Sequence, residues 1–139
     1  MNVGMVPNMN MGIMEDVFGV TKAKRGIEME HELLFINPEL KEDLNVTVRR
    51  GDKWYQKASV GDLVVIKETE TMTTISMGRI RGIAYIPYLL IPQEWLELEH
   101  DHLCRNRHGL LQAMIRAYPN FSSNGKEMIT VIIFELEED

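Results

Sequence analysis

The residues best suited to chemistry lie in a short run where Thr47 and Arg49 alternate with Val46 and Val48. Successive side chains of a strand point to opposite faces, so Thr47 and Arg49 are expected to share one face. A guanidinium offers a planar fork of hydrogen-bond donors that suits a phosphate or the edge of a base. The spacing therefore predicts that Arg49, together with the Thr47 hydroxyl, binds an anion or a nucleotide in a cleft.

Three further residues extend this candidate site along the chain. Arg50 is expected on the opposite face of the strand from Arg49, and Lys53 and Trp54 follow in a predicted loop. A cation beside an aromatic ring can hold a nucleotide, because the base stacks on the ring while the phosphate pairs with the cation. The alternative for Trp54 is packing in the core or at the rim of the fold.

A second basic pair, Arg79 and Arg81, has the same spacing of two. Both would share a face of an unbroken strand, and Arg79 would then extend the basic surface. The alternative is ion pairing with Glu68 or Glu70 on a neighbouring strand. Residues 44–82 hold seven basic and four acidic side chains, whereas the whole chain has a formal charge of −6. Nucleic-acid binding is therefore expected on one local surface, which favours a single strand or one base over long duplex.

His100, Cys104 and His108 are spaced by four residues, which would align three potential zinc ligands on one helical face. A predicted break before Gly109 would scatter them, so no metal site is predicted. A catalytic cysteine is not predicted either, since closeness in sequence does not establish geometry. His100 and Asp101 are expected either to line the cleft or to belong to a plain loop between helices. The chain has no glycine-rich phosphate loop, and no cofactor is expected.

These side chains must be positioned mainly by strands. Alternating or β-branched runs predict five or six strands: residues 26–35, 45–50, 63–67, 73–86 and 128–136. Residues 73–86 form either one long strand or two strands kinked at Gly78 or Gly82. A helical turn is predicted over residues 38–43, and two adjacent helices over residues 92–100 and 108–117. The pattern indicates an α+β fold, a small β-barrel of five to six strands with two helices packed at one side.

The length of 139 residues allows one domain, predicted over residues 26–139. Residues 1–25 include a Met-rich stretch without a helical or strand period. They are predicted to form a mobile N-terminal arm, with a short helix near residues 15–20. The single cysteine fits a cytoplasmic protein. The chain has no apolar run long enough to span a bilayer, so no membrane contact is expected.

The run TVRRGDKW at residues 47–54, followed by VGDLV at residues 60–64, resembles the ASCH family of PUA-like domains. Further similar stretches follow in the family's order: EWLELEH at 94–100, GLL at 109–111, AYP at 117–119 and TVIIF at 130–134. The resemblance covers about residues 30–137. It implies a small β-barrel with a cleft between the barrel and the helices, and an association with RNA binding.

Some members of the family that this chain resembles are amidohydrolases that deacetylate N4-acetylcytidine. Those enzymes use a Lys, a Thr three residues later and a Glu from the helical segment. The resemblance implies that Thr47 and Glu99 would take the Thr and Glu roles, whereas Leu44 stands where the Lys is expected. Lys41 or Lys53 would have to replace that lysine.

Three hypotheses for the function follow. The first is a module that binds RNA, single-stranded nucleic acid or a nucleotide, with these candidate residues: Thr47, Arg49, Arg50, Lys53, Trp54 and Arg79. The second is an amidohydrolase acting on a modified nucleoside such as N4-acetylcytidine, with Thr47 and Glu99 as catalytic residues. The third is an interaction factor that engages a protein partner through the Met-rich arm and acidic surfaces.

Overall fold

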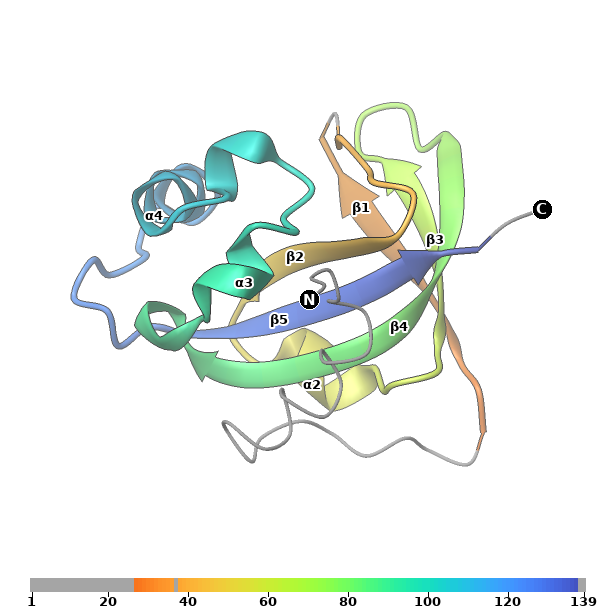
Figure 1. The fold of residues 1–139 in the computed structure, drawn as a ribbon, viewed down its shortest axis with the longest axis horizontal. Coiled ribbons are helices and arrows are strands. Elements are labelled where there is room, and N and C mark those ends of the chain that lie inside the picture. Colours follow the sequence, from red (N-terminus) through yellow and green to blue (C-terminus); the bar gives the residue numbers. More distant parts are fainter. Residues whose placement is uncertain (1–26, 37, 138–139) are drawn as a thin grey trace.

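The computed structural model describes residues 27–36 and 38–137, so the predicted arm of residues 1–25 lies outside the described residues. The strands and helices are shown in Figure 1: β1 Glu30–Phe35, β2 Leu44–Arg50, α2 Lys53–Lys57, β3 Leu63–Glu68, β4 Thr74–Pro87, η1 Tyr88–Leu90, α3 Gln93–Leu96, η2 His102–Cys104, α4 Arg107–Ala117 and β5 Met128–Leu136. Within this part of the chain, no helix is long and apolar enough to cross a membrane.

The five strands form one mixed sheet in the order β1-β3-β4-β5-β2. β1 pairs in parallel with β3, and the other three pairings are antiparallel. The sheet curls, but its two edge strands, β1 and β2, do not pair with each other. The predicted α+β class is confirmed, and the predicted barrel stays open along the gap between β1 and β2, which we call the seam.

The core has two parts because β5 is buried on both faces. Val131 and Ile133 pack on one side with Trp95 of α3 and with residues of α4. Ile132 and Phe134 point to the other side, into the curl of the sheet. Alternation along a strand thus gives β5 two apolar faces, as expected for a strand with neighbours on both sides. The helices α3 and α4 lie at one end of the molecule, beside β2 and β5, whereas α2 lies below the sheet (Figure 1).

The predicted strands agree closely with the observed ones. β2, β3 and β5 begin and end within one residue of their predicted bounds, and α4 matches the second predicted helix. β4 is one long strand, and its pairing with β5 shifts register between Ile80 and Gly82, close to one of the two glycines where a kink was expected. β1 begins only at Glu30, four residues later than predicted.

The first predicted helix, over residues 92–100, is wrong in length because α3 ends at Leu96. Beyond α3 the chain runs alongside the edge of β2. Val46 N donates to Leu98 O at 2.8 Å, and His100 N donates to Val46 O at 3.1 Å. These backbone groups form hydrogen bonds with the edge strand β2, so they do not continue the helix. The consequence is that Glu99 lies beside β2 in an extended segment.

Two other local predictions were wrong. Residues 38–43 form no helical turn, because the Asn45 side chain holds this stretch by accepting from Lys41 N and donating to Lys41 O. Lys53 and Trp54, predicted in a loop, begin the short helix α2. Trp54 is half-buried against the core inside the curl of the sheet, which fixes the helix there.

Candidate functional site

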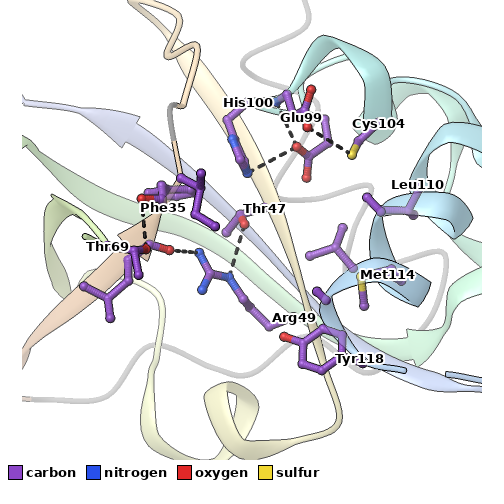
Figure 2. A pocket seen from close by; sticks show the side chains of 16 residues that line it. Phe35, Thr47, Arg49, Thr69, Glu99, His100, Cys104, Leu110, Met114 and Tyr118 are labelled. Atoms are coloured by element: carbon purple, nitrogen blue, oxygen red, sulfur yellow. Dashed lines mark hydrogen bonds and ion pairs between the residues drawn. The ribbon is translucent and has the colours of Figure 1, made fainter. Parts of the chain in front are cut away.

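A pocket of about 350 Å³ lies at the seam, next to α4 (Figure 2). Its walls come from five parts of the chain: the end of β1, the middle of β2, Thr69 just after β3, the segment after α3, and α4 with the residue that follows it. The pocket exists where the sheet fails to close, since β1 and β2 do not pair with each other and side chains fill the space between them. Residues far apart in sequence, such as Phe35, Arg49 and Glu99, therefore meet around one cavity.

Arg49 crosses the seam and is held at both ends. Its Nη2 donates to Leu34 O at 2.8 Å, and its Nε donates to Thr47 Oγ1 at 3.3 Å. The guanidinium carbon lies 5.0 Å from the centroid of the Phe35 ring, within range of a cation–π contact. Burial lowers the pKa of Arg49, but a guanidinium stays charged at any physiological pH. Among the described residues, no carboxylate forms an ion pair with Arg49.

Glu99 is 2% exposed and lines the same pocket. Its Oε1 accepts a hydrogen bond from Asp101 N at 3.0 Å. Burial raises the pKa of Glu99 to about 8, and the Asp101 charge adds to this, while the Asp101 N–H and the charges of Arg49 and Arg105 act against it. At pH 7 this side chain is therefore mainly a neutral carboxylic acid, which both donates and accepts a hydrogen bond.

His100 follows directly and is also neutral at pH 7. Burial, followed by the positive charge of Arg49, lowers the pKa of its imidazole to about 4. Its Nε2 lies 3.4 Å from Glu99 Oε1, and its ring meets Phe35 edge-on with centroids 4.4 Å apart. The buried Nδ1 has no hydrogen-bond partner within the described part of the chain. A buried polar atom without a partner is uncommon in folded proteins, and here it belongs to a residue that lines the pocket.

The remaining walls are largely apolar. Leu110 and Met114 of α4 and the Tyr118 ring complete the side opposite the sheet (Figure 2). Cys104 lies at the rear, and burial raises the pKa of its thiol to about 12, so it is not a nucleophile at neutral pH. The pocket thus combines one fixed cation, the Asp101 carboxylate at its wall, neutral donors and acceptors, and aromatic surfaces. Such a set suits a flat, mainly uncharged polar ligand.

The structure brings together three of the candidate residues: Thr47, Arg49 and Glu99 all line the pocket. Figure 2 shows Thr47 lying between the other two. Thr47 is 1% exposed and pairs in register with Ile132, so it faces into the curl of the sheet as the alternation predicted. Arg50 points away from the pocket, as expected for the residue next to Arg49 on a strand. Its Nη2 lies 3.0 Å from Glu127 Oε1.

The other candidates do not line the pocket. Lys53 and Trp54 lie on α2, and the Trp54 ring contacts the His31 ring edge-on with centroids 5.7 Å apart. Arg79 pairs with Glu28 and Glu137. It cannot extend the pocket, because those carboxylates hold it on the outer face of β4. The alternative of ion pairing is the observed one, with partners other than Glu68 and Glu70.

Neither lysine offered as a replacement for the family's catalytic Lys reaches the pocket. Lys41 Nζ donates to Glu97 O at 2.9 Å, and Lys53 is exposed on α2. Leu44 is buried in the core and carries no charge. The described pocket lining contains no lysine at all.

The potential metal ligands that lie close together in the structure are not the evenly spaced His100, Cys104 and His108. His100 faces the pocket and His108 is exposed at the start of α4, so these two do not join Cys104 in a ligand set. A different group, Glu39, Asp101 and His102, has ligand atoms within 4.8 Å of one another. His102 Nδ1 already lies 2.7 Å from Glu39 Oε1 at this exposed position, which accounts for their closeness.

Sequence reasoning missed several walls of the pocket, the aromatic rings of Phe35 and Tyr118 among them. Phe35 stands at the end of the predicted strand over residues 26–35, and Tyr118 directly follows the predicted helix over residues 108–117, so neither ring was singled out as a site residue. Only the position of the seam shows that both rings border a cavity. Long-range strand pairing places β1 and β2 at the two edges of the sheet, and local sequence patterns do not predict that placement.

No protein-family model matches the chain, and no curated protein matches it in sequence. Solved structures resemble it in fold. An ASCH domain from Lactobacillus crispatus JV V101 matches with a TM-score of 0.60 and 12% identity, over 78% of this chain and 79% of that one. Protein EF3133 from Enterococcus faecalis V583, described under the family model DUF984, matches with a TM-score of 0.51 and 10% identity, over 94% and 89%. The chain has an ASCH-type fold.

Proposed function

We propose that this chain, with its ASCH-type fold, is a binding module that holds one base of an RNA, of another single-stranded nucleic acid, or of a free nucleotide in the seam pocket. The observation that carries the proposal is the convergence of Arg49, Thr47 and the neutral Glu99 on one cavity with aromatic walls. A cavity volume of about 350 Å³ is at the lower end of ordinary ligand sites. Such a volume suits a single base better than a stretch of duplex.

The hydrogen-bonding groups fit the edge of a nucleobase. A protonated Glu99 presents a donor and an acceptor side by side, as do the edges of the bases. Arg49 adds N–H donors, and the rings of Phe35 and Tyr118 offer surfaces against which a flat ring can pack. Thr47 and Arg49 lie on a strand, so their positions are fixed before the ligand arrives and little entropy is lost on binding.

The direct test is calorimetric titration of the protein with each of the four ribonucleosides and their monophosphates. Arg49→Gln is expected to weaken the best ligand by about 1–3 kcal/mol, the range for a good bidentate contact. Arg81→Gln is the matched control, because Arg81 is also a strand arginine but pairs with Glu135 outside the pocket. Equal affinity of the Arg49→Gln variant and the wild type would contradict the proposal.

A second candidate is hydrolysis of an acetylated nucleoside such as N4-acetylcytidine. What favours it is that Thr47 and Glu99, the residues matching two catalytic positions of the family's enzymes, line one pocket. In this reaction water adds to the acetyl carbonyl, the carbon–nitrogen bond breaks, and acetate and the free amino group leave. The lack of a lysine in the described lining speaks for binding over catalysis.

Incubation with N4-acetylcytidine, followed by mass spectrometry of the products, separates the two candidates. An amidohydrolase releases acetate, and Thr47→Val abolishes the release while keeping the fold. Binding without any release supports the first candidate alone. A protein partner for residues 1–25 and a cytoplasmic location remain predictions from the sequence.

A further inference from the structure

We propose that the open edge of β1 is a docking site for an extended peptide that carries basic residues at alternate positions. The peptide pairs with the backbone of Glu30 and Glu32, and its basic side chains lie against the carboxylates of the same two residues. This site is separate from the seam pocket and does not depend on the proposed binding of a base.

The two edges of the sheet differ in what covers them. At the β2 edge, Val46 N donates to Leu98 O and Val46 O accepts from His100 N, so the segment after α3 lies along this strand. β1 pairs with β3 alone, and no described residue supplies a second neighbour along it. An edge strand with unpaired N–H and C=O groups is a template on which another extended chain can pair.

β1 faces β3 through its odd-numbered residues. Met29 O, just before the strand, accepts from Leu63 N, and Phe35 O, at the end of the strand, accepts from Thr69 N. Residues two apart on a strand direct their backbone groups to the same neighbour. The even-numbered residues of β1 therefore direct their N–H and C=O groups to the open edge.

These even-numbered residues are Glu30, Glu32 and Leu34. The contact of Leu34 agrees with this assignment, because its carbonyl accepts from Arg49 Nη2 across the seam. Arg49 thus covers the edge where β1 meets the pocket. Within the described part of the chain, the backbone groups of Glu30 and Glu32 have no such partner. Figure 1 shows the start of β1 away from α3 and α4, and neither glutamate lines the pocket.

Three exposed carboxylates stand two residues apart on the outer side of this stretch: Glu28, Glu30 and Glu32, which we call the acidic row. Glu28 pairs with Arg79, and Glu32 pairs with Lys67. Glu30 lies between them and has no ion-pair partner among the described residues. A strand added at this edge places its outward side chains beside the acidic row, and cross-strand pairs of opposite charge are favourable.

The acidic row determines which kind of strand the edge accepts. Antiparallel pairing of β1 with β1 of a second copy brings the glutamates of both strands close together, and like charges at that distance are destabilising. Charged edge residues therefore keep identical chains apart, while they attract a strand of opposite charge. A nucleic acid does not fit, because it has no peptide N–H groups to pair with β1 and its phosphates are repelled.

Exposed apolar side chains precede the acidic row. Ile27 is 74% exposed and Met29 is 48% exposed, both directly before β1. An unbranched Met side chain adapts to partners of different shape. Ile27 and Met29 stand at odd positions, whereas the acidic row stands at even ones. The peptide that fits best therefore has basic residues at alternate positions and an apolar residue at an end, one position away from the nearest basic residue.

The test titrates the acetylated and amidated heptapeptide Val-Lys-Thr-Lys-Thr-Lys-Val into the full chain, followed by calorimetry. One peptide is expected to bind per chain. Glu30→Lys should weaken binding by about tenfold, because a favourable cross-strand pair becomes a repulsive one, and Glu30→Gln should weaken it by about threefold. The matched control is Glu94→Lys, since Glu94 is an exposed glutamate on α3. This variant should bind like the wild type.

Hydrogen exchange measured by nuclear magnetic resonance tests the pairing itself. Saturation with the peptide should slow exchange of the Glu30 and Glu32 amides, which face the open edge, and change little at His31 and Leu33, which face β3. The same peptide with methyl groups on its backbone nitrogens keeps the charges but cannot donate hydrogen bonds. It should bind about tenfold more weakly.

Several results overturn this inference. Equal binding of the methylated peptide would mean attraction by charge alone, and unchanged affinity in Glu30→Lys would remove the acidic row from the site. A dimer in sedimentation that the peptide does not dissociate would assign the edge to a second copy. Lys22 and Lys24 of this chain also stand two apart. Tighter peptide binding after Lys22→Gln with Lys24→Gln would assign the edge to the chain itself.

This inference and the proposed function can fail separately. If a nucleoside binds and the lysine peptide does not, the β1 edge is not a docking site and the base pocket stands. If the peptide binds as described and no nucleoside or nucleotide does, the proposed function fails and the docking site stands.

Discussion

Arg49 and Glu99 share a pocket without forming an ion pair, and this sets the chemistry of the site. A carboxylate beside a guanidinium usually has a lowered pKa, but here burial of Glu99 outweighs the attraction to Arg49. His100 is kept neutral by burial in the same way. The pocket lining therefore combines the positive charge of Arg49 and the Asp101 carboxylate with two groups that are neutral at pH 7, Glu99 and His100.

Stability should depend on the pH through Glu99. Its pKa is about 8 in the folded protein and near 4.5 when unfolded, so the folded state binds more protons between these values and loses stability as the pH rises. His100 has the opposite effect, but only between about pH 4 and its ordinary value of 6.5. From pH 6.5 to pH 8, Glu99 alone should cost about 2 kcal/mol.

The substitution Glu99→Gln should remove this loss, because the amide stays neutral and its oxygen can still accept from Asp101 N. Urea unfolding of wild type and variant at pH 6.5 and pH 8.5 measures it. The gain in stability from the substitution should be larger at pH 8.5. A gain that is the same at both values would show that Glu99 is already ionised at neutral pH. Ligand affinity should follow the same trend, falling above pH 8 in the wild type only.

At the scale of elements, β1 is the least secured wall of the pocket. It pairs with one neighbour, β3, and lies at the sheet edge. The buried Asp62 holds it in place: the Asp62 carboxylate accepts from Met29 N at 3.2 Å and from Ser59 N at 3.0 Å, and lies 2.8 Å from His31 Nε2. This carboxylate connects the start of β1 to the turn before β3.

Replacing Asp62 by Ala should destabilise the fold by about 3 kcal/mol, because it leaves buried donors without an acceptor. Hydrogen exchange should show the largest loss of protection in β1, and the affinity for a base should fall because Leu34 and Phe35 border the pocket. Asp52→Ala is the control, since Asp52 is exposed at the start of α2. Unchanged protection of β1 in Asp62→Ala would mean that β3 alone holds the strand.

Local sequence patterns predicted individual strands and helices far better than the contacts by which these elements meet. Alternation placed Thr47 and Arg49 on one face of β2, and that face borders the pocket. The length of α3 could not be predicted, because Leu98 and His100 bind the edge of β2 by backbone hydrogen bonds that no side-chain pattern records. The extended Glu99 is a consequence of that contact.

At the scale of the whole molecule, the pocket results from a sheet that curls without closing. The sequence predicted an α+β fold with strands near the observed positions, but the strand order decides which two edges meet. Buried side chains such as Phe35 then border a cavity. The arginines show the same limit: sequence identified a basic segment, and folding pairs Arg50 and Arg79 with distant glutamates.

The central claim is that the seam pocket binds a base, and nuclear magnetic resonance tests it most directly. Amide signals of the ¹⁵N-labelled protein are followed while the best-binding nucleoside from the calorimetric titration is added. The account predicts saturable shifts centred on Phe35, Thr47, Arg49, Glu99 and Tyr118, which disappear in Arg49→Gln and persist in Arg81→Gln. Shifts centred on any other surface, or saturable shifts at the pocket that are the same in Arg49→Gln, would contradict it.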